Sequence, residues 1–192
     1  RRCENALYLA ELLVALTATG SRARALADRL RAAWEAVTFN QFHDILCGSA
    51  VHESNLESQA RYGTALEEAE TIAADGLRRL ATSLRPRADR GQAVVVFNPL
   101  PRRRSDVVEA ELFSPLPPPT ARLRSWTAFR FQPVEPVDTG QGPYATLRLV
   151  DERNRPVNAQ IVDGKLFPNG YRLRVRFIAH DVPACGTRTF HA

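Results

Sequence analysis

Hydrophobic residues recur at intervals of three and four positions through the first 84 residues of the chain. This spacing is typical of amphipathic helices and predicts three of them, each burying one apolar stripe against its neighbours. The stripes are Cys3, Leu7, Ala10, Val14 and Thr17; then Leu26, Leu30, Ala33 and Val37; then Tyr62, Leu66, Ala69, Ala73, Leu77, Leu80 and Leu84. Gly20 is expected to end the first helix and Ser49 to cap the third. Short turns between such helices favour an antiparallel bundle.

From residue 92 onward the hydrophobic period changes to two, which is typical of strands. The segments with this pattern are AVVVFN, DVVEAELF, YATLRLV, PVNAQIV, YRLRVRFIAH and TRTFH, the last of which we expect at an edge. The proline-rich run SPLPPPT, residues 114–120, cannot supply ladder donors and is expected to be an exposed connection. Asn98, which precedes Pro99, is expected to stabilise a turn.

These two patterns together predict an α+β multidomain fold. We expect an antiparallel three-helix bundle over residues 1–88, followed by an antiparallel β-sandwich-like domain over residues 89–192. Residues 85–92, RPRADRGQ, are polar and are expected to form an accessible linker. About five strands do not easily close two packed layers, so we expect the second domain to be incomplete. The chain has no methionine and begins inside a helical pattern, which suggests a piece of a longer protein.

Composition and charge narrow the class of protein. With 44% hydrophobic and 24% charged residues, the chain is expected to be an ordinary soluble globular protein. Its net charge of +5 raises the question of nucleic-acid binding. Residues 1–90 carry equal numbers of acidic and basic side chains, so the excess lies in the second half. There the arginines of YRLRVRF alternate with apolar residues, as on the exposed face of a strand, and we do not expect a nucleic-acid partner.

The cysteines and the longest apolar runs bear on the cellular setting. Cys3, Cys47 and Cys185 are odd in number and have no CxxC spacing, which argues against a disulfide framework and against a thiolate metal site. A reducing cytoplasm is the expected location. No apolar run approaches the roughly 20 residues of a spanning helix, and no membrane association is expected. A retained signal peptide is not expected either, because no basic segment precedes an apolar one.

The stretch NQFHDILCGS, residues 40–49, places His43 beside Asp44 within an Ala/Leu/Arg-rich helical pattern. One interpretation is a metal site, since an imidazole can ligate a divalent cation and the adjacent carboxylate can contact metal or substrate. Such a site needs three or four ligands, and His52, His180 and His191 offer no convincing spacing. The other interpretation is a histidine at the C-terminal end of a helix, where the helix dipole favours it. Spacing and chemistry alone leave both open.

Several segments resemble glycoside hydrolase family 38, the class II α-mannosidases. They are NQFHDILCGS with the preceding Trp34, the opening RRCENALYLAELL, VVVFNPLPRRRSDVV, DERNRPVNAQ and DVPACGTRTF. In that family a His-Asp motif followed by Gly-Ser or Gly-Thr lies on a loop between two helices of a bundle. The resemblance covers nearly the full chain in the correct order. Cys47 departs from it, because bacterial members commonly have proline there, and we expect this to affect turn rigidity more than chemistry.

The resemblance implies roles for the residues of this stretch. It makes His43 one ligand of a catalytic zinc and Asp44 a neighbour of the same site that hydrogen-bonds the sugar. Phe42 beside His43, and Gln41 through a backbone group that it holds, are further candidate substrate-binding residues. Trp34 is expected to pack in the core or wall rather than to stack on a sugar. The other ligands, an HxD pair and an aspartate that is also the nucleophile, would come from a preceding α/β catalytic domain that this chain lacks.

The resemblance therefore implies a fragment of a zinc-dependent retaining α-mannosidase, which hydrolyses α-linked mannose in glycans or mannosides with two carboxylates. No carboxylate of this chain matches either catalytic position, so we expect the fragment alone to be inactive. Its expected partners are a mannose-containing carbohydrate and the missing N-terminal catalytic domain. Two alternatives stay open: a non-catalytic carbohydrate-binding or scaffold module, and a homologue whose His-Asp pair is only structural.

Overall fold

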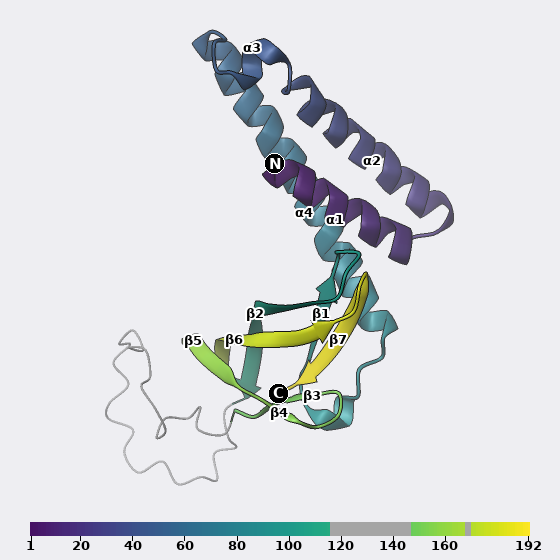
Figure 1. The fold of residues 1–192 in the computed structure, drawn as a ribbon, viewed down its shortest axis with the longest axis vertical. Helices are drawn as coiled ribbons and strands as arrows, with labels where there is room; N and C mark the ends of the chain where they lie inside the picture. The colour runs from purple at the N-terminus through teal and green to yellow at the C-terminus, as the bar shows by residue number, and fades with distance from the viewer. Residues whose placement is uncertain (116–146, 168–169) are drawn as a thin grey trace. The chain divides into compact units, whose positions relative to one another are not determined.

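The structure, a computed structural model, describes residues 1–115, 147–167 and 170–192 (Figure 1). These residues form two compact units, Arg1–Arg85 and Pro86–Ala192. The first unit is helical and the second contains antiparallel sheets, so the predicted α+β class is confirmed. Residues 116–120 of the proline-rich run lie outside the described part of the chain. Among the helices of the described residues, none has the length and hydropathy needed to cross a membrane.

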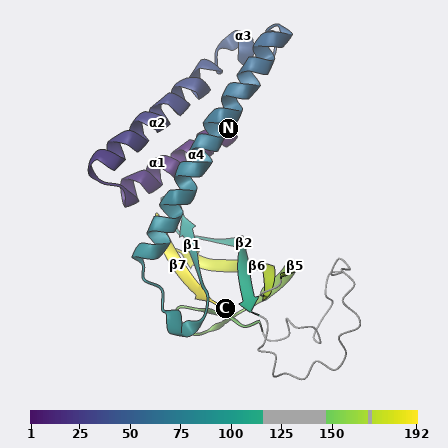
Figure 2. The same cartoon turned by 180° about the vertical axis from the view of Figure 1, so that it is seen from behind.

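The helical unit contains four helices rather than the three predicted. They are α1 (Arg2–Thr17), α2 (Gly20–Phe39), α3 (His43–Leu46) and α4 (His52–Ser83). The three long helices contact one another in every pair, and α3 is a single turn between α2 and α4 (Figures 1 and 2). A four-residue helix has no hydrophobic repeat that a helical period could reveal, so the sequence pattern missed α3.

Helix spacing identified the buried face of α2, most of that of α1 and only part of that of α4. All four positions predicted for α2 are buried, as are the first three predicted for α1. In α4, however, Leu77 and Leu84 are exposed, and small residues fill most of the buried face. The buried residues of α4 are Ser58, Ala65, Ala69, Ile72, Ala73 and Gly76. The predicted stripe therefore contains two buried residues, Ala69 and Ala73, and misses the other small residues with which α4 packs closely against its neighbours.

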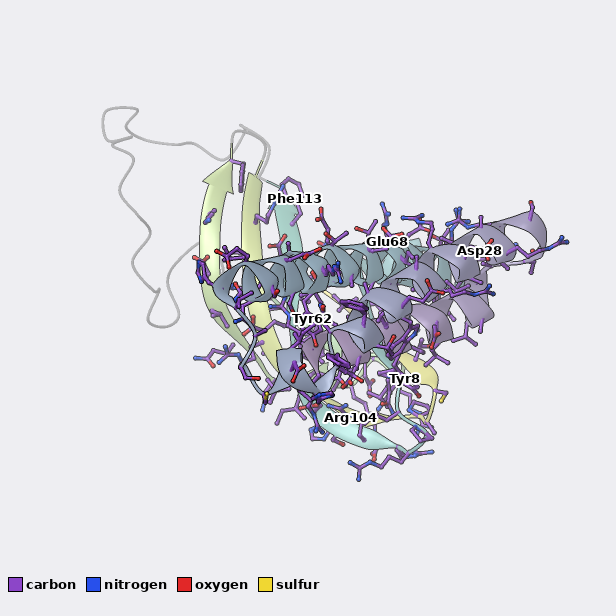
Figure 3. All side chains as sticks on the ribbon, turned by 90° about the horizontal axis from the view of Figure 1, so that it is seen from above. Tyr8, Asp28, Tyr62, Glu68, Arg104 and Phe113 are labelled. Carbon is purple, nitrogen blue, oxygen red and sulfur yellow. The ribbon has the colours of Figure 1, made fainter. Side chains whose placement is uncertain are left out.

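Ion pairs cross the surface between α2 and α4. Arg29 donates two hydrogen bonds to Glu68, one of them 3.0 Å long, and Arg22 donates to Asp75. Glu68 is labelled on its helix in Figure 3. All four side chains are at least partly exposed, and such pairs contribute roughly 0–1 kcal/mol each. Burial of the apolar faces, rather than charge pairing, must therefore supply most of the stability of the helical unit.

Gly76 allows α4 to approach α1 closely. A Cβ atom added at Gly76 would lie 2.7 Å from the Cβ of Leu13, which is fully buried. The Leu13 Cβ is bonded directly to the backbone, so it cannot swing aside as the end of a long side chain could. Gly63, in the same helix, has no atom within 4 Å of an added Cβ. The two glycines thus form a matched pair, one in tight contact and one open.

We expect Gly76→Ala to lower the free energy of unfolding of the helical unit by about 1–2 kcal/mol, because the added methyl group must push the two helices apart. Gly63→Ala should instead raise it by roughly 0.5–1 kcal/mol, because alanine is the better helix former and meets no neighbour. Urea denaturation followed by circular dichroism at 222 nm compares the two variants. Equal stabilisation by both substitutions would show that α1 and α4 do not depend on close packing at Gly76.

Within the described residues, the second unit has two antiparallel sheets. One has the strand order β1 (Ala93–Asn98), β7 (Gly186–His191), β3 (Leu149–Asp151), β4 (Pro156–Val157), and the other β2 (Arg104–Pro115), β6 (Gly170–Val182), β5 (Ala159–Phe167). The prediction that TRTFH forms an edge was wrong, because β7 pairs with both β1 and β3. Edge position depends on partners distant in the sequence, which a local alternation cannot show. A short 3₁₀ helix, Ala88–Arg90, lies in the expected linker.

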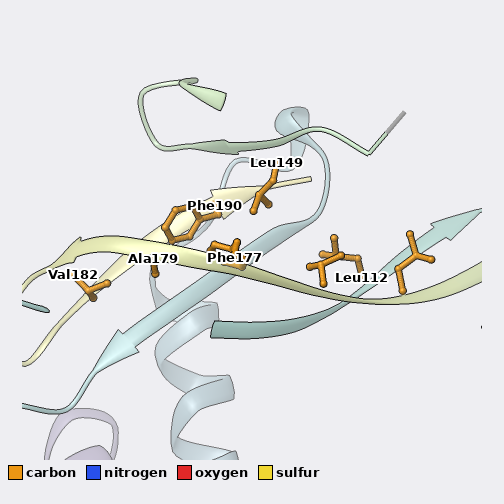
Figure 4. Close-up of a cluster of buried hydrophobic side chains, with 8 residues drawn as sticks. Leu112, Leu149, Phe177, Ala179, Val182 and Phe190 are labelled. Atoms are coloured by element: carbon orange, nitrogen blue, oxygen red, sulfur yellow. The ribbon is translucent and has the colours of Figure 1, made fainter. Parts of the chain in front are cut away.

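Both sheets contribute to one hydrophobic core (Figure 4). Its buried members are Leu112, Leu149, Leu173, Val175, Phe177, Ala179, Val182 and Phe190. The rings of Phe177 and Phe190 meet edge to face with their centroids 4.9 Å apart, a preferred aromatic geometry. The alternation predicted for YRLRVRF is confirmed: β6 sends every second side chain into this core and exposes the intervening arginines.

Asp151 organises the hairpin between β3 and β4. The Asp151 carboxylate is buried and accepts hydrogen bonds from the backbone N–H of Arg153 (2.9 Å), the backbone N–H of Arg155 (2.9 Å) and Nε of Arg155 (2.8 Å). Burial alone would raise the pKa of Asp151, but the hydrogen bonds outweigh it and lower the pKa from 3.8 to about 2. The ionised form is therefore the one that holds the turn.

Because the folded-state pKa of Asp151 is depressed from 3.8 to about 2, its contribution to stability is complete well above pH 3.8 and is lost as the pH falls through 3.8 towards 2. We expect Asp151→Asn to reduce the free energy of unfolding at pH 7 by about 2 kcal/mol, and this difference from wild type to shrink progressively below about pH 5. Arg155→Gln removes the guanidinium, whose Nε and Nη2 both contact Asp151 Oδ2, but leaves both backbone donors, so its effect should be smaller. Chemical denaturation at a series of pH values measures the difference, and a pH-independent difference would contradict this role.

Candidate functional site

The candidate site is the connection between α2 and α4, residues 40–51, which includes α3 (Figure 1). Asn40 closes α2 and is 1% exposed. Its Nδ2 donates a hydrogen bond of 2.9 Å to the backbone carbonyl of Ser58 in α4, which pins the end of α2 to the neighbouring helix. Asn40 Oδ1 is buried and has no hydrogen-bond partner among the described residues. The connection thus starts from a fixed point in the helical unit.

His43 and Asp44 are exposed on α3. Their side chains are 79% and 62% exposed, and His43 Nε2 lies 3.3 Å from Asp44 Oδ1. The ring of Phe42 lies beside the imidazole, with centroids 4.3 Å apart and planes tilted by 44°. Phe42 precedes the helix in an extended conformation and is itself exposed. The structure therefore brings together three of the four predicted site residues at the surface.

Gln41, the fourth predicted residue, points to a different partner. Its Nε2 donates to Glu4 Oε1 of α1 at 2.8 Å, rather than to a backbone group near His43. Trp34 also contacts α1, because its Nε1 donates to Glu11 Oε1 at 2.9 Å, and its side chain is half-buried. Both residues join α2 and its end to α1, which supports the connection from a second side.

The second half of the connection is a tight turn at Cys47, Gly48 and Ser49. Gly48 has a φ of +76°, a conformation that favours glycine. Ser49 does not cap α4 as predicted, since α4 begins at His52 after Val51. Its hydroxyl instead donates to the carbonyl of Asp44 at 3.3 Å and lies 3.0 Å from Cys47 Sγ. The contact with Ser49 lowers the pKa of the exposed Cys47 thiol.

The backbone at Cys47 explains what its departure from the family pattern changes. Its φ of −79° is one that proline also adopts. Its N–H, however, donates to the carbonyl of His43 at 3.3 Å, a bond that proline cannot make. Cysteine therefore closes the α3 turn with a hydrogen bond where proline would restrict φ.

Large hydrophobic side chains are exposed around the same connection. They are Phe39, Phe42, Leu46, Val51 and Leu56, all at least half exposed. Arg61 covers one face of Phe39, with its guanidinium carbon 4.4 Å from the ring centroid. A grouping of this kind on one end of a helical unit is typical of a surface that another part of a protein covers.

His43 and Asp44 supply an imidazole and a carboxylate, the side chains from which zinc sites are commonly built. Asp44 can accept a hydrogen bond from the Nε2–H of His43, which leaves Nδ1 free of a proton and able to bind a metal. Metal-binding histidines commonly donate their other ring N–H to a carboxylate in this way. Zinc requires three or four protein ligands. Within residues 1–115, 147–167 and 170–192, no group of three or more His, Cys, Asp or Glu side chains could hold a metal ion. Among the described residues the pair therefore offers one imidazole and one carboxylate, which is fewer ligands than a zinc site needs.

Sequence reasoning missed the role of Asn40. Its position at the end of the predicted second helix was visible, and asparagine is common where helices end. Its hydrogen bond to Ser58 was not, because the two residues become neighbours only when α2 and α4 pack together. Asn40 is thus the first residue of the stretch NQFHDILCGS, but the sequence alone assigned it no function.

The chain was compared with known proteins. Residues 1–80 match the family model described as "Alpha mannosidase middle domain". Comparison with curated protein sequences found no match. Among solved structures, an alpha-mannosidase from Enterococcus faecalis V583 has a TM-score of 0.61 at 18% identity, over 98% of this chain and 22% of that chain. A protein in the glycosyl hydrolase family 38, also from Enterococcus faecalis, has a TM-score of 0.60 at 20% identity, over 98% of this chain and 23% of that chain.

The chain thus spans less than a quarter of the length of these two structures. The similarity in fold nevertheless extends through both of its units, and the family match covers the segment that contains His43 and Asp44. The resemblance inferred from the sequence is therefore confirmed: residues 1–80 match the alpha mannosidase middle domain, and nearly the whole chain is similar in fold to parts of two structures, one described as an alpha-mannosidase and the other as a protein in the glycosyl hydrolase family 38.

Proposed function

We propose that this chain is part of a zinc-dependent retaining α-mannosidase, in which it supplies one zinc ligand and one substrate contact. The observation that carries the proposal is the match of residues 1–80 to the alpha mannosidase middle domain, combined with the exposed His43-Asp44 pair within that match. Its substrate would be α-linked mannose in glycans or small mannosides.

His43 would hold the zinc through one imidazole nitrogen, and Asp44 would orient the ring or accept a hydrogen bond from a sugar hydroxyl. Phe42 would shield one side of the imidazole, since its ring already lies against it. Bound zinc would supply Lewis acidity and a template for sugar hydroxyls. The HxD pair, the nucleophile and the acid would come from a catalytic domain outside this chain.

The exposed apolar residues around α3 support this division of the site. An apolar surface is costly in water, and covering the exposed half of each of these large side chains would contribute about 1 kcal/mol. We propose that the catalytic domain covers this surface and thereby brings its own ligands to His43. The fixed end of α2, pinned by Asn40, would then set where the imidazole enters the shared site.

The isolated chain is expected to have no α-mannosidase activity, because a retaining mechanism needs two carboxylates that this chain does not supply. The test is hydrolysis of an aryl α-mannoside by the purified chain with added zinc, with the His43→Ala variant as the control. Turnover by wild type above that control would show that the chain contains catalytic groups of its own, and would overturn the proposed division.

A further inference from the structure

A depression of about 210 Å³ lies on the exposed face of the three-stranded sheet, in the second unit. Its lining residues are Glu111 of β2, Asp163, Lys165 and Phe167 of β5, and Arg172 and Arg174 of β6. None of them belongs to the connection that carries His43. Five of the six are charged, so the depression has the character of a polar recognition site rather than of an apolar groove.

A β-bulge in β5 places the charged residues of that strand, Asp163 and Lys165, on the exposed face of the three-stranded sheet. The register shifts between Ile161 and Asp163, so that Asp163 pairs with exposed Arg174 instead of buried Leu173. Because side chains alternate along a strand, the shift also turns Lys165 outward. Without the bulge both charges would face the hydrophobic core. The fold therefore builds this charged surface through a specific local irregularity.

The first cross-strand row of the face is acidic. Arg174 has Glu111 as its register partner on β2 and Asp163 on β5. Its Nη2 lies 3.8 Å from Asp163 Oδ2, which is a loose ion pair. The row thus contains two carboxylates and one guanidinium, and it keeps oxygen atoms that can accept further hydrogen bonds.

The second row lies at Arg172, two residues before Arg174 in β6, and is basic. Arg172 has Lys165 as its partner on β5 and Phe113, which is exposed (Figure 3), on β2. Among the described residues neither Arg172 nor Lys165 forms an ion pair. The Arg172 guanidinium lies over the ring of Phe167, 4.8 Å from its centroid. Stacking of this kind orients the guanidinium in advance and reduces the entropy lost on binding.

We propose that this depression binds the phosphate group of a small hydroxylated molecule. Arg172 offers a planar fork of donors and Lys165 a point charge, and together they match a doubly charged phosphate better than a single carboxylate. The acidic row lies about 7 Å away along the strand, where Glu111 and Asp163 can accept hydrogen bonds from hydroxyl groups of the same ligand. The site does not depend on the proposed mannosidase function.

Lys165 is the chain's single lysine, which gives a direct readout of occupancy. An amine-specific acylating reagent modifies only Lys165 and the N-terminus, and peptide mass spectrometry separates the two. Inorganic phosphate is expected to slow acylation of Lys165 and to leave that of the N-terminus unchanged. Equal protection of both amines, or of neither, would overturn the proposal.

Titration calorimetry of the whole chain with inorganic phosphate, glycerol 3-phosphate and glycerol tests the ligand. We expect saturable binding of both phosphates and none of glycerol, with glycerol 3-phosphate binding more tightly. Arg172→Gln and Lys165→Gln should each weaken phosphate binding about tenfold, because each removes a hydrogen bond to a charged group. Arg176→Gln is the matched control, since Arg176 lies on the same face of β6 but is engaged with Glu109 at 2.9 Å. It should change affinity by less than about twofold.

Circular dichroism of each variant confirms that the sheet is retained. Equal losses in the Arg172→Gln and Arg176→Gln variants would mean general attraction to a basic surface and would overturn the assigned site. Absence of saturable phosphate binding by the wild-type chain would also overturn the assigned site. Equal affinities for inorganic phosphate and glycerol 3-phosphate would overturn the role given to Glu111 and Asp163.

Discussion

His43→Ala, made in a longer protein that contains this chain and the remaining zinc ligands, is expected to lose bound zinc and turnover together. Mutation of a group that only supports a metal ligand typically lowers metal affinity or activity by about 10–100-fold. Loss of the ligand itself should cost more, so we expect kcat/KM to fall at least about 100-fold. Zinc content by atomic emission and hydrolysis of an aryl α-mannoside measure the two effects. His52→Ala is the matched control, because His52 is an exposed histidine in the first turn of α4.

Asp44→Asn separates the two roles in the proposed site. The amide keeps the size of the side chain and removes its charge, so zinc should stay bound while the reaction slows by roughly 10–100-fold through loss of a charge-assisted hydrogen bond. Full zinc content and normal turnover in His43→Ala would instead mean that the His-Asp pair is only a structural turn. That result would favour a non-catalytic module over an α-mannosidase.

The largest expected effect on folding belongs to Asn98, at the end of β1. The side chain is 3% exposed, and its Nδ2 lies 2.8 Å from the carbonyl oxygen of Arg102, 2.9 Å from that of Pro183 and 3.3 Å from that of Val182. Its Oδ1 accepts the N–H of Leu100 at 3.1 Å, which confirms the predicted turn. One amide thus ties the turn after β1 to the turn between β6 and β7.

Asn98→Ala is expected to lower the free energy of unfolding of the second unit by about 3 kcal/mol, because carbonyl groups in buried and partly buried positions lose their donor at once. Asn98→Asp should be at least as harmful at neutral pH, since it places a carboxylate against the same carbonyl oxygens. Asn158→Ala, at an exposed asparagine of the same unit, is the control and should change stability by less than about 0.5 kcal/mol. Chemical denaturation followed by circular dichroism measures the free energy of unfolding of each variant. A small decrease for Asn98→Ala would show that water replaces the lost donor.

Local pattern was enough to predict the class of fold and most of its long elements. The three-to-four spacing of the first 84 residues and the alternation in YRLRVRF depend only on which side of a helix or strand meets the core. The NQFHDILCGS stretch likewise marked the candidate site, because its residue types and order resemble those of a known family. Turn chemistry at Asn98 was also predictable, since asparagine before proline acts through its own neighbours.

Tertiary structure alone decided the features that depend on partners distant in the sequence. The buried face of α4 consists mostly of small residues, among them Gly76 in close contact with Leu13 of α1, and no spacing of leucines reveals that contact. The interior position of β7 follows from pairing with β1 and β3, and the outward turn of Lys165 follows from a bulge in β5. Asn40 holds the candidate site only once Ser58 lies beside it. The sequence by itself therefore determined the periodic elements and the chemistry of short motifs, whereas packing and strand register decided which residues those motifs meet, because both are set by contacts between segments rather than within them.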